Sequence, residues 1–153
     1  LLRRQLAQQE LTLAEKGLAR LTSELNGLQR EKERAEAGIE RSRQRTAEAV
    51  TEQERLAAEL EGLSRKAEAQ RKDNAQGPDA EGEKFLADLL KQQARAAEKR
   101  KRAGDDELSA RKRAEELAQE VRRSLQDQER KRVEVQRQED LVQQLRAKLD
   151  AIR

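Results

Sequence analysis

Between residues 11 and 70, apolar side chains recur at steps that alternate between three and four residues without a slip. Leu, Ile or Ala occupies thirteen of the eighteen positions in this row. Two apolar positions in every seven residues form the seam of a coiled coil. The pattern therefore predicts a helix over about residues 1–72, which has to bury its seam against another helix.

A second row of the same kind runs from residue 86 to residue 152, and thirteen of its twenty positions are apolar. Between the rows lies Gly77-Pro78, which opposes helix because Pro lacks a backbone donor and disfavours helix in the preceding residue. The row also changes phase across this break. We predict an all-α fold: a long coiled coil of two helices, about 1–72 and 84–153, separated by a loop or hinge at 73–83.

The residues predicted to pair the helices are large and apolar. They are Leu18, Leu21, Leu25, Leu28, Ile39, Leu56, Leu60, Leu63, Leu86, Leu89, Leu117, Val121, Val135, Val142, Leu145, Leu149 and Ile152. Several seam positions carry polar side chains instead, and the more informative of these are Lys32, Gln53, Arg100, Glu107 and Lys131. Such residues cost stability and can fix the register or the partner of a coiled coil. Alternatively, a long rod tolerates them as local defects.

The sequence leaves open what covers the two seams. A hairpin in which the numbers of facing residues sum to about 163 matches the two richest apolar segments, but it sets Lys32 against Lys131. An extended rod would pair with another coiled-coil chain, and in a parallel homodimer Glu31 would meet Glu36 beside the first helix. The two arrangements are nearly balanced, with a small margin for a rod paired with a chain of different sequence.

The composition argues against a conventional globular core, because 42% of the residues are charged and Phe85 is the only aromatic residue. Low hydrophobicity with high charge is also typical of disorder, but disorder would not space apolar residues so regularly. Basic and acidic residues are intermixed, with a net charge of +3. This mixture is typical of a solvated helix surface, so a nucleic-acid partner is disfavoured.

The chain contains no His or Cys, so a Ser/His/Asp triad and zinc sites of the usual His/Cys type are impossible. A straight helical rod offers no water-excluded cleft for other catalysis, and we expect no enzymatic activity, cofactor or metal site. No apolar run approaches the ~20 residues of a membrane span, so we expect no membrane partner. Because the chain lacks Met and starts with a helix-like sequence, we interpret it as a segment of a longer rod.

Two local features are candidates for partner contacts. The sharpest basic cluster comprises Lys99, Arg100, Lys101, Arg102, Arg111, Lys112 and Arg113. It either contacts an acidic partner, such as a tubulin-like surface, or is a solvated face, since four consecutive helical residues point in different directions. The densest apolar patch, residues 85–90, either docks a partner or seals the start of the second helix.

The heptads are rich in Gln, Arg, Glu and Ala, as in the segment EQERLAAELE from Glu52 to Glu61. In this composition the whole chain resembles the rods of long eukaryotic cytoskeletal proteins, in particular rootletin-like centrosomal linkers and the ruler proteins of motile cilia. The resemblance implies a structural scaffold or spacer in a cytoplasmic, cytoskeletal assembly of a centrosome or cilium. The heptads are also similar to the arms of chromosome-condensing (SMC-like) ATPases, which implies, as the alternative, an antiparallel coiled-coil arm of such an ATPase or of another mechanical protein.

Overall fold

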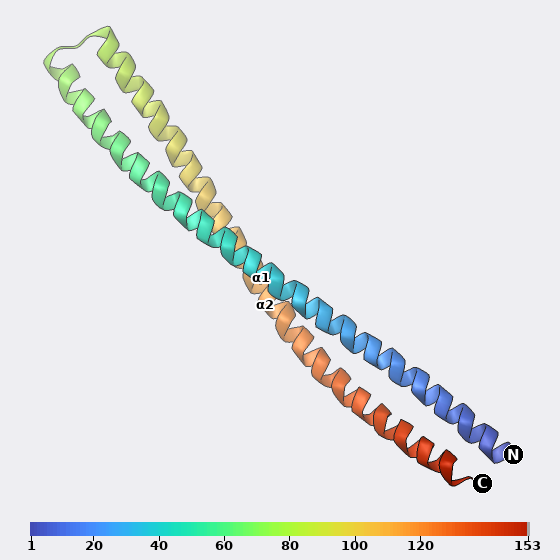
Figure 1. Ribbon diagram of the computed structural model, residues 1–153. Helices are drawn as coiled ribbons and strands as arrows, with labels where there is room; N and C mark the ends of the chain where they lie inside the picture. Colours follow the sequence, from blue (N-terminus) through green and yellow to red (C-terminus); the bar gives the residue numbers. More distant parts are fainter. Residues whose placement is uncertain (153) are drawn as a thin grey trace. The chain divides into compact units, whose positions relative to one another are not determined.

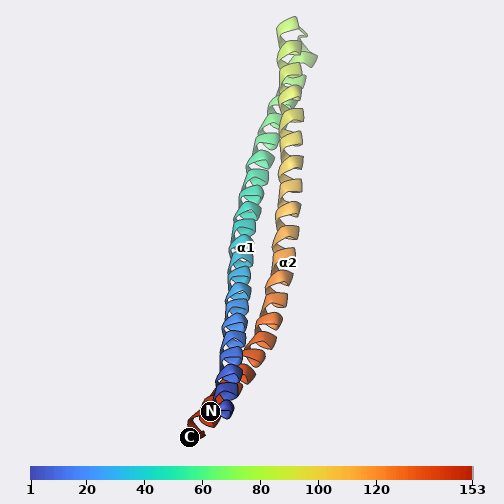
Figure 2. The same cartoon turned by 90° about the vertical axis from the view of Figure 1, so that its right-hand side faces the viewer.

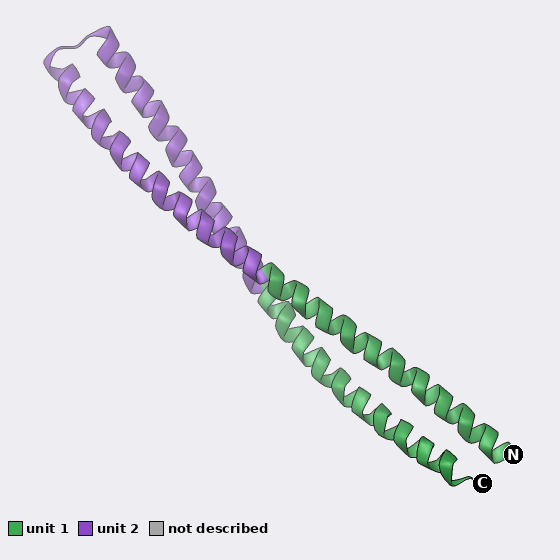
Figure 3. Ribbon diagram, in the orientation of Figure 1, with its two compact units in different colours: residues 1–38, 116–153 green, residues 39–115 purple. Residues whose placement is uncertain are grey.

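The structure, a computed structural model, describes residues 1–152 and contains two helices that pack against each other as a hairpin (Figure 1). Helix α1 spans Leu2–Gln76 and helix α2 spans Ala80–Ala151. Two compact units divide the hairpin: unit 1 contains Leu1–Gly38 and Glu116–Arg153, and unit 2 contains Ile39–Glu115 (Figure 3). In each unit, a segment of α1 lies antiparallel beside a segment of α2 (Figures 1 and 2). The predicted all-α fold of two long helices is confirmed.

The break between the helices is shorter than the predicted loop at 73–83, because only Gly77–Asp79 is non-helical. Helix α1 continues to Gln76, and the Gly77 amide still donates to the carbonyl of Asp73, at 3.1 Å. Asp79 caps α2 by accepting a hydrogen bond from the Gly82 amide on its side-chain oxygen, at 2.5 Å. Capping by a carboxylate satisfies an amide at the helix start, so α2 begins four residues earlier than predicted.

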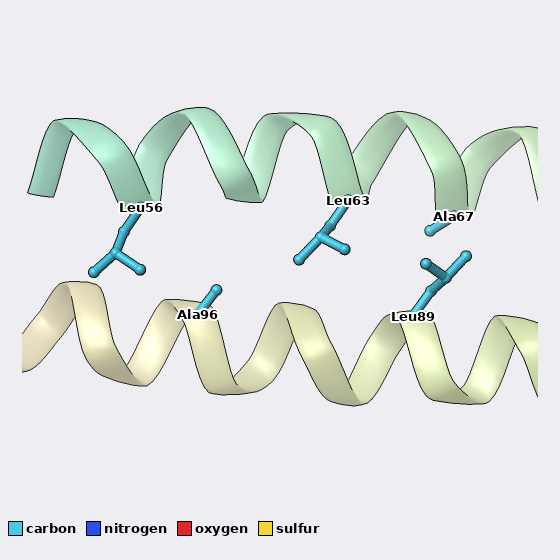
Figure 4. Packing of buried hydrophobic residues seen from close by; sticks show 5 residues of the cluster. All are labelled: Leu56, Leu63, Ala67, Leu89 and Ala96. Carbon is cyan, nitrogen blue, oxygen red and sulfur yellow. The ribbon is translucent and has the colours of Figure 1, made fainter. Parts of the chain in front are cut away.

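The core of unit 2 is a row of aliphatic side chains from both helices (Figure 4). Leu56 has no exposed surface, and Leu63 and Ala67 follow it along α1. Leu89 and Ala96 meet them from α2. Large and small side chains thus alternate across the interface, which lets the two helices interdigitate at each turn.

In unit 1 an apolar cluster lies near the start of α1 and the end of α2. Its buried members are Leu11, Ala14 and Val142, with Leu18, Leu145 and Leu149 packed around them. Near the other end of this unit, a Cβ atom on Gly38 would lie 2.8 Å from Cδ1 of Leu117. The Gly38 position therefore lets Leu117 pack directly on the backbone of α1, which explains why a helix-weakening residue is accommodated there.

Candidate helix-pairing interface

The interface is built from the seam of each helix. Every predicted seam residue lies at a buried or half-buried position within the unit that contains it, from Leu18 through Ile152. Among all seam positions of α2, Arg100 alone is exposed in the part of the chain that the structure describes. The 3.5-residue period therefore locates the side chains that each helix turns toward the other.

The structure pairs the two seams within one chain, so the arrangement that the sequence favoured by a small margin, an extended rod beside a different chain, is not the one observed. The register also differs from the predicted one. Facing residues such as Leu28 and Gln128, or Glu24 and Lys131, have numbers that sum to about 156 instead of 163. This is a shift of one heptad, which keeps the same faces in contact while changing every partner along them.

The heptad shift removes the like-charge contact that counted against a hairpin. Lys131 no longer faces Lys32, and its ammonium group lies 2.7 Å from a carboxylate oxygen of Glu24 on α1 and 3.2 Å from Glu134 on its own helix. Lys32 lies 3.4 Å from Glu36 on its own helix. The hydrogen bond from Lys131 lowers the pKa of Glu24, and the bonds to Glu24 and Glu134 raise the pKa of Lys131.

A second polar layer links the helices in unit 2. Gln53 Nε2 donates to Glu107 Oε2 at 3.2 Å, and Arg111 donates to the other oxygen of Glu107 at 3.1 Å. These two hydrogen bonds, that from Gln53 first, lower the pKa of the Glu107 carboxyl. Gln53 and Glu107, two of the polar seam residues singled out from the sequence, thus contact each other across the interface.

Sequence reasoning overlooked two glutamines of α2 that reach across the seam in unit 1. Gln138 Nε2 donates to the Ala14 carbonyl at 2.9 Å, and Gln128 Nε2 donates to the Leu28 carbonyl at 3.3 Å. Gln128 is only 1% exposed, and its Oε1 has no hydrogen-bond partner among the described residues. Their position on the seam could have indicated these contacts, because a polar side chain that is buried at a seam position needs a hydrogen-bond partner across the interface.

Acid should weaken the hairpin through Glu24 and Glu107. Both have a lower pKa in the folded chain than the ordinary 4.5, so the folded state holds their protons more weakly than the unfolded state. The stabilisation of the folded state by these two carboxylates is therefore complete above pH 4.5, and it is lost as the pH falls through their lowered pKa values. Urea unfolding of the parent and of Glu24→Gln/Glu107→Gln should show a smaller loss of stability in the variant between pH 7 and pH 3. An equal loss of stability in the parent and the variant would show that Glu24 and Glu107 do not cause the acid sensitivity.

On the alkaline side the same reasoning applies to Lys131 with the opposite sign. Its raised pKa means that the folded state binds the proton more tightly than the unfolded state. The stabilisation of the folded state by protonated Lys131 is complete below its ordinary pKa of 10.5, and it is lost as the pH rises through the raised pKa. The Glu24–Lys131 layer therefore supports the hairpin across the neutral range and weakens at both extremes.

The seven residues of the predicted basic cluster are all exposed, but they do not gather on one face. Lys99 and Arg113 lie on one edge of the interface, Arg111 lies on the other, and Lys112 points away from it. Arg111 and Arg102 are engaged on their own helix by carboxylates four residues before them. The cluster is therefore spread around α2 rather than forming one basic surface.

Small seam residues leave a groove along one edge of unit 2, with a volume of about 560 Å³. Ser42, Ala49, Ala103 and Ala110 line it together with flanking charged residues, among them Glu52 and Asp106. Within residues 1–152 no group of three or more His, Cys, Asp or Glu side chains is placed to hold a metal ion. Neither helix has, over the same residues, a stretch long and apolar enough to cross a bilayer.

The geometry defines a two-helix antiparallel coiled coil whose interface combines aliphatic layers with interhelical hydrogen bonds and ion pairs. Comparisons with protein-family models, with curated proteins and with solved structures found no match to the chain.

Proposed function

We propose that the chain is a non-catalytic structural segment, an antiparallel coiled-coil hairpin that acts as a spacer or arm in a larger assembly. The observation that supports this proposal is the intramolecular pairing of α1 with α2 along both units. Each helix covers most of the seam of the other, so the hairpin can hold its form without a second chain. Its outer surface is then available for contacts with other components.

Two assemblies are candidates. The composition of the heptads supports a scaffold or spacer in a cytoskeletal assembly of a centrosome or cilium. The antiparallel pairing supports the second candidate, an arm of an SMC-like ATPase or of another mechanical protein, because such an arm requires two helices that run in opposite directions within one chain. A hetero-partner would in either case bind to the hairpin as a whole, because α1 and α2 already pack against each other.

The hairpin itself can be tested first, because the chain has no Cys of its own. Glu15 and Arg146 lie 3.3 Å apart in unit 1 although they are 131 residues apart in sequence. In the variant Glu15→Cys/Arg146→Cys, a short bis-maleimide should join the two thiols within one chain, as seen by mass under denaturing conditions. In an extended rod these positions would be about 200 Å apart, and only cross-links between chains would form. That result would contradict the hairpin and the proposed arm together.

Affinity capture with the cross-linked hairpin then separates the candidate assemblies. Cytoskeletal filament or centrosomal proteins are expected for the scaffold, and ATPase head domains or DNA for the arm. The matched control is Leu56→Lys/Leu117→Lys, which disrupts the cores of both units and should abolish specific capture. If neither class is enriched over this control, the proposed assemblies are both wrong.

A further inference from the structure

The seam of unit 2 is covered unevenly. Over residues 39–63 of α1 and 86–114 of α2, one row of seam residues, which we term the inner row, is buried throughout: Ser42, Ala49, Leu56, Leu63, Leu89, Ala96, Ala103 and Ala110. The other row over the same residues, the outer row, is half-buried or exposed: Ile39, Thr46, Gln53, Leu60, Leu86, Gln93, Arg100, Glu107 and Ala114. The difference ends nearer the turn, because Ala67, the next outer-row position, is buried and Gln70, the next inner-row position, is half-buried. Over residues 39–63 and 86–114 the inner row is therefore buried more completely than the outer row, which is partly open on one side, although Ser42, Ala49, Ala103 and Ala110 of the inner row also line the groove at the opposite edge.

Unit 1 does not show this split. Leu11 and Val142, which occupy the heptad positions of the outer row, are buried there, whereas Leu21 and Leu28, at the positions of the inner row, are half-buried. The uneven coverage is therefore a property of unit 2 and not of the heptad pattern as such.

The residues that flank the outer row in unit 2 are also unusual for a solvated helix edge. The residue that follows an inner-row position is Arg at two of the eight positions, Arg43 and Arg111, and is uncharged at the other six. We term these six the edge row: Val50, Ala57, Ser64, Leu90, Ala97 and Gly104. In unit 1 the same heptad positions are mostly polar or charged, among them Glu15, Glu36, Arg132 and Glu139, with Ala118 and Leu125 as the apolar exceptions, and Glu15 forms an ion pair with Arg146. An apolar stripe widened from two to three positions per heptad is typical of helices that face a bundle core.

Charges beside this open face lack partners in the single hairpin. Glu54 and Arg100 line a small depression of about 230 Å³ together with Val50 and Ala57, and Lys101 follows on α2. Among residues 1–152, none of Glu54, Arg100 and Lys101 forms an ion pair. The acidic group belongs to α1 and the basic groups belong to α2, so each helix presents the charge that would complement the other helix in a second copy.

We propose that two copies of this chain associate through the open face of unit 2, defined by the outer row and the edge row, to form a four-helix bundle. A two-fold axis parallel to the helices would place α1 of one copy antiparallel to α2 of the other, as in up-and-down bundles. Residues whose numbers sum to about 156 would then be level across the dimer as well, because both hairpins share one register. This symmetry sets Glu54 beside Lys101 of the second copy.

Dimerisation through this face would bury Leu60, Leu86 and Leu90 more completely, and apolar burial is its driving force. The Glu54–Lys101 contacts, one on each side of the axis, would select the orientation of the copies. Association by this route is independent of whether the hairpin serves as a spacer or as an arm, because it uses the face that α1 and α2 leave open in unit 2.

Sedimentation equilibrium of the full chain tests the proposal. The Glu15→Cys/Arg146→Cys variant, cross-linked within each chain, is used so that an exchange of helices between chains cannot mimic the dimer. We expect a mass that rises from 17.5 kDa toward twice that value as the concentration increases. A mass that stays at 17.5 kDa at every concentration would overturn the proposal and would leave a chain of different sequence as the occupant of the face.

Two sets of variants locate the interface. Ala97→Glu, on the edge row, should weaken dimerisation at least tenfold, whereas Gln92→Glu, an exposed position on the opposite edge of α2, should leave it unchanged.

Glu54→Lys and Lys101→Glu should each weaken the dimer, and the double variant Glu54→Lys/Lys101→Glu should restore it. Circular dichroism shows whether each variant keeps its helices. Dimerisation that is insensitive to Ala97→Glu, or that the double variant fails to restore, would contradict the proposed geometry.

Discussion

Replacing Leu56 by Ala should lower the free energy of unfolding by about 2–5 kcal/mol, because removing a fully buried Leu loses its transfer free energy and leaves a cavity. Leu56 has no exposed surface, and it packs in the same cluster as Leu63 and Ala96. The cavity cannot be filled by neighbours of this size without a shift of the helices. Urea unfolding of the full chain, followed by circular dichroism, measures the change.

Leu108→Ala is the matched control, since Leu108 lies on α2 in the same unit but is 66% exposed. Its substitution should change the free energy of unfolding by no more than about 0.5 kcal/mol. Equal losses for Leu56→Ala and Leu108→Ala would mean that the seam is not the packing surface of unit 2.

Replacing Gln128 by Leu should raise the free energy of unfolding by about 1–3 kcal/mol, which is the typical cost of a buried polar group without a partner. Gln128 is 1% exposed, and among residues 1–152 its amide nitrogen has a hydrogen-bond partner, the Leu28 carbonyl, whereas its oxygen has none. Leu has a similar volume and removes the orphaned oxygen. The midpoint of thermal unfolding should shift to a higher temperature, and the midpoint of urea unfolding to a higher urea concentration.

Gln138→Leu provides the comparison, because Gln138 donates in the same way to the Ala14 carbonyl but is only half-buried. Its oxygen can reach water, so its replacement should change the stability less than that of Gln128. A loss of stability in Gln128→Leu would show that the buried oxygen is satisfied in solution, for example by an ordered water.

The faces that meet could be read from the amino-acid pattern, for a direct physical reason. Each helix repeats its apolar residues every 3.5 positions, and that period alone determines which side of the helix avoids water. Leu56 and Leu89 were recognised as pairing residues in this way and are buried in the structure. The break could also be placed, because Pro78 and Gly77 oppose helix whatever surrounds them. Its length could not, because it depends on the capping contact from Asp79 to the Gly82 amide.

The partner and the register could not be read from the pattern, because registers that differ by seven residues bury the same faces. Apolar burial therefore barely distinguishes a sum of about 163 from one of about 156. The choice rests on the short turn at Gly77–Asp79 and on contacts between residues far apart in the chain, Lys131 with Glu24 and Gln53 with Glu107. The uneven coverage of the seam in unit 2 could not be read from the amino-acid pattern either. It depends on how far the two helices rotate about their axes when they meet, and a repeat within one helix carries no information about that rotation.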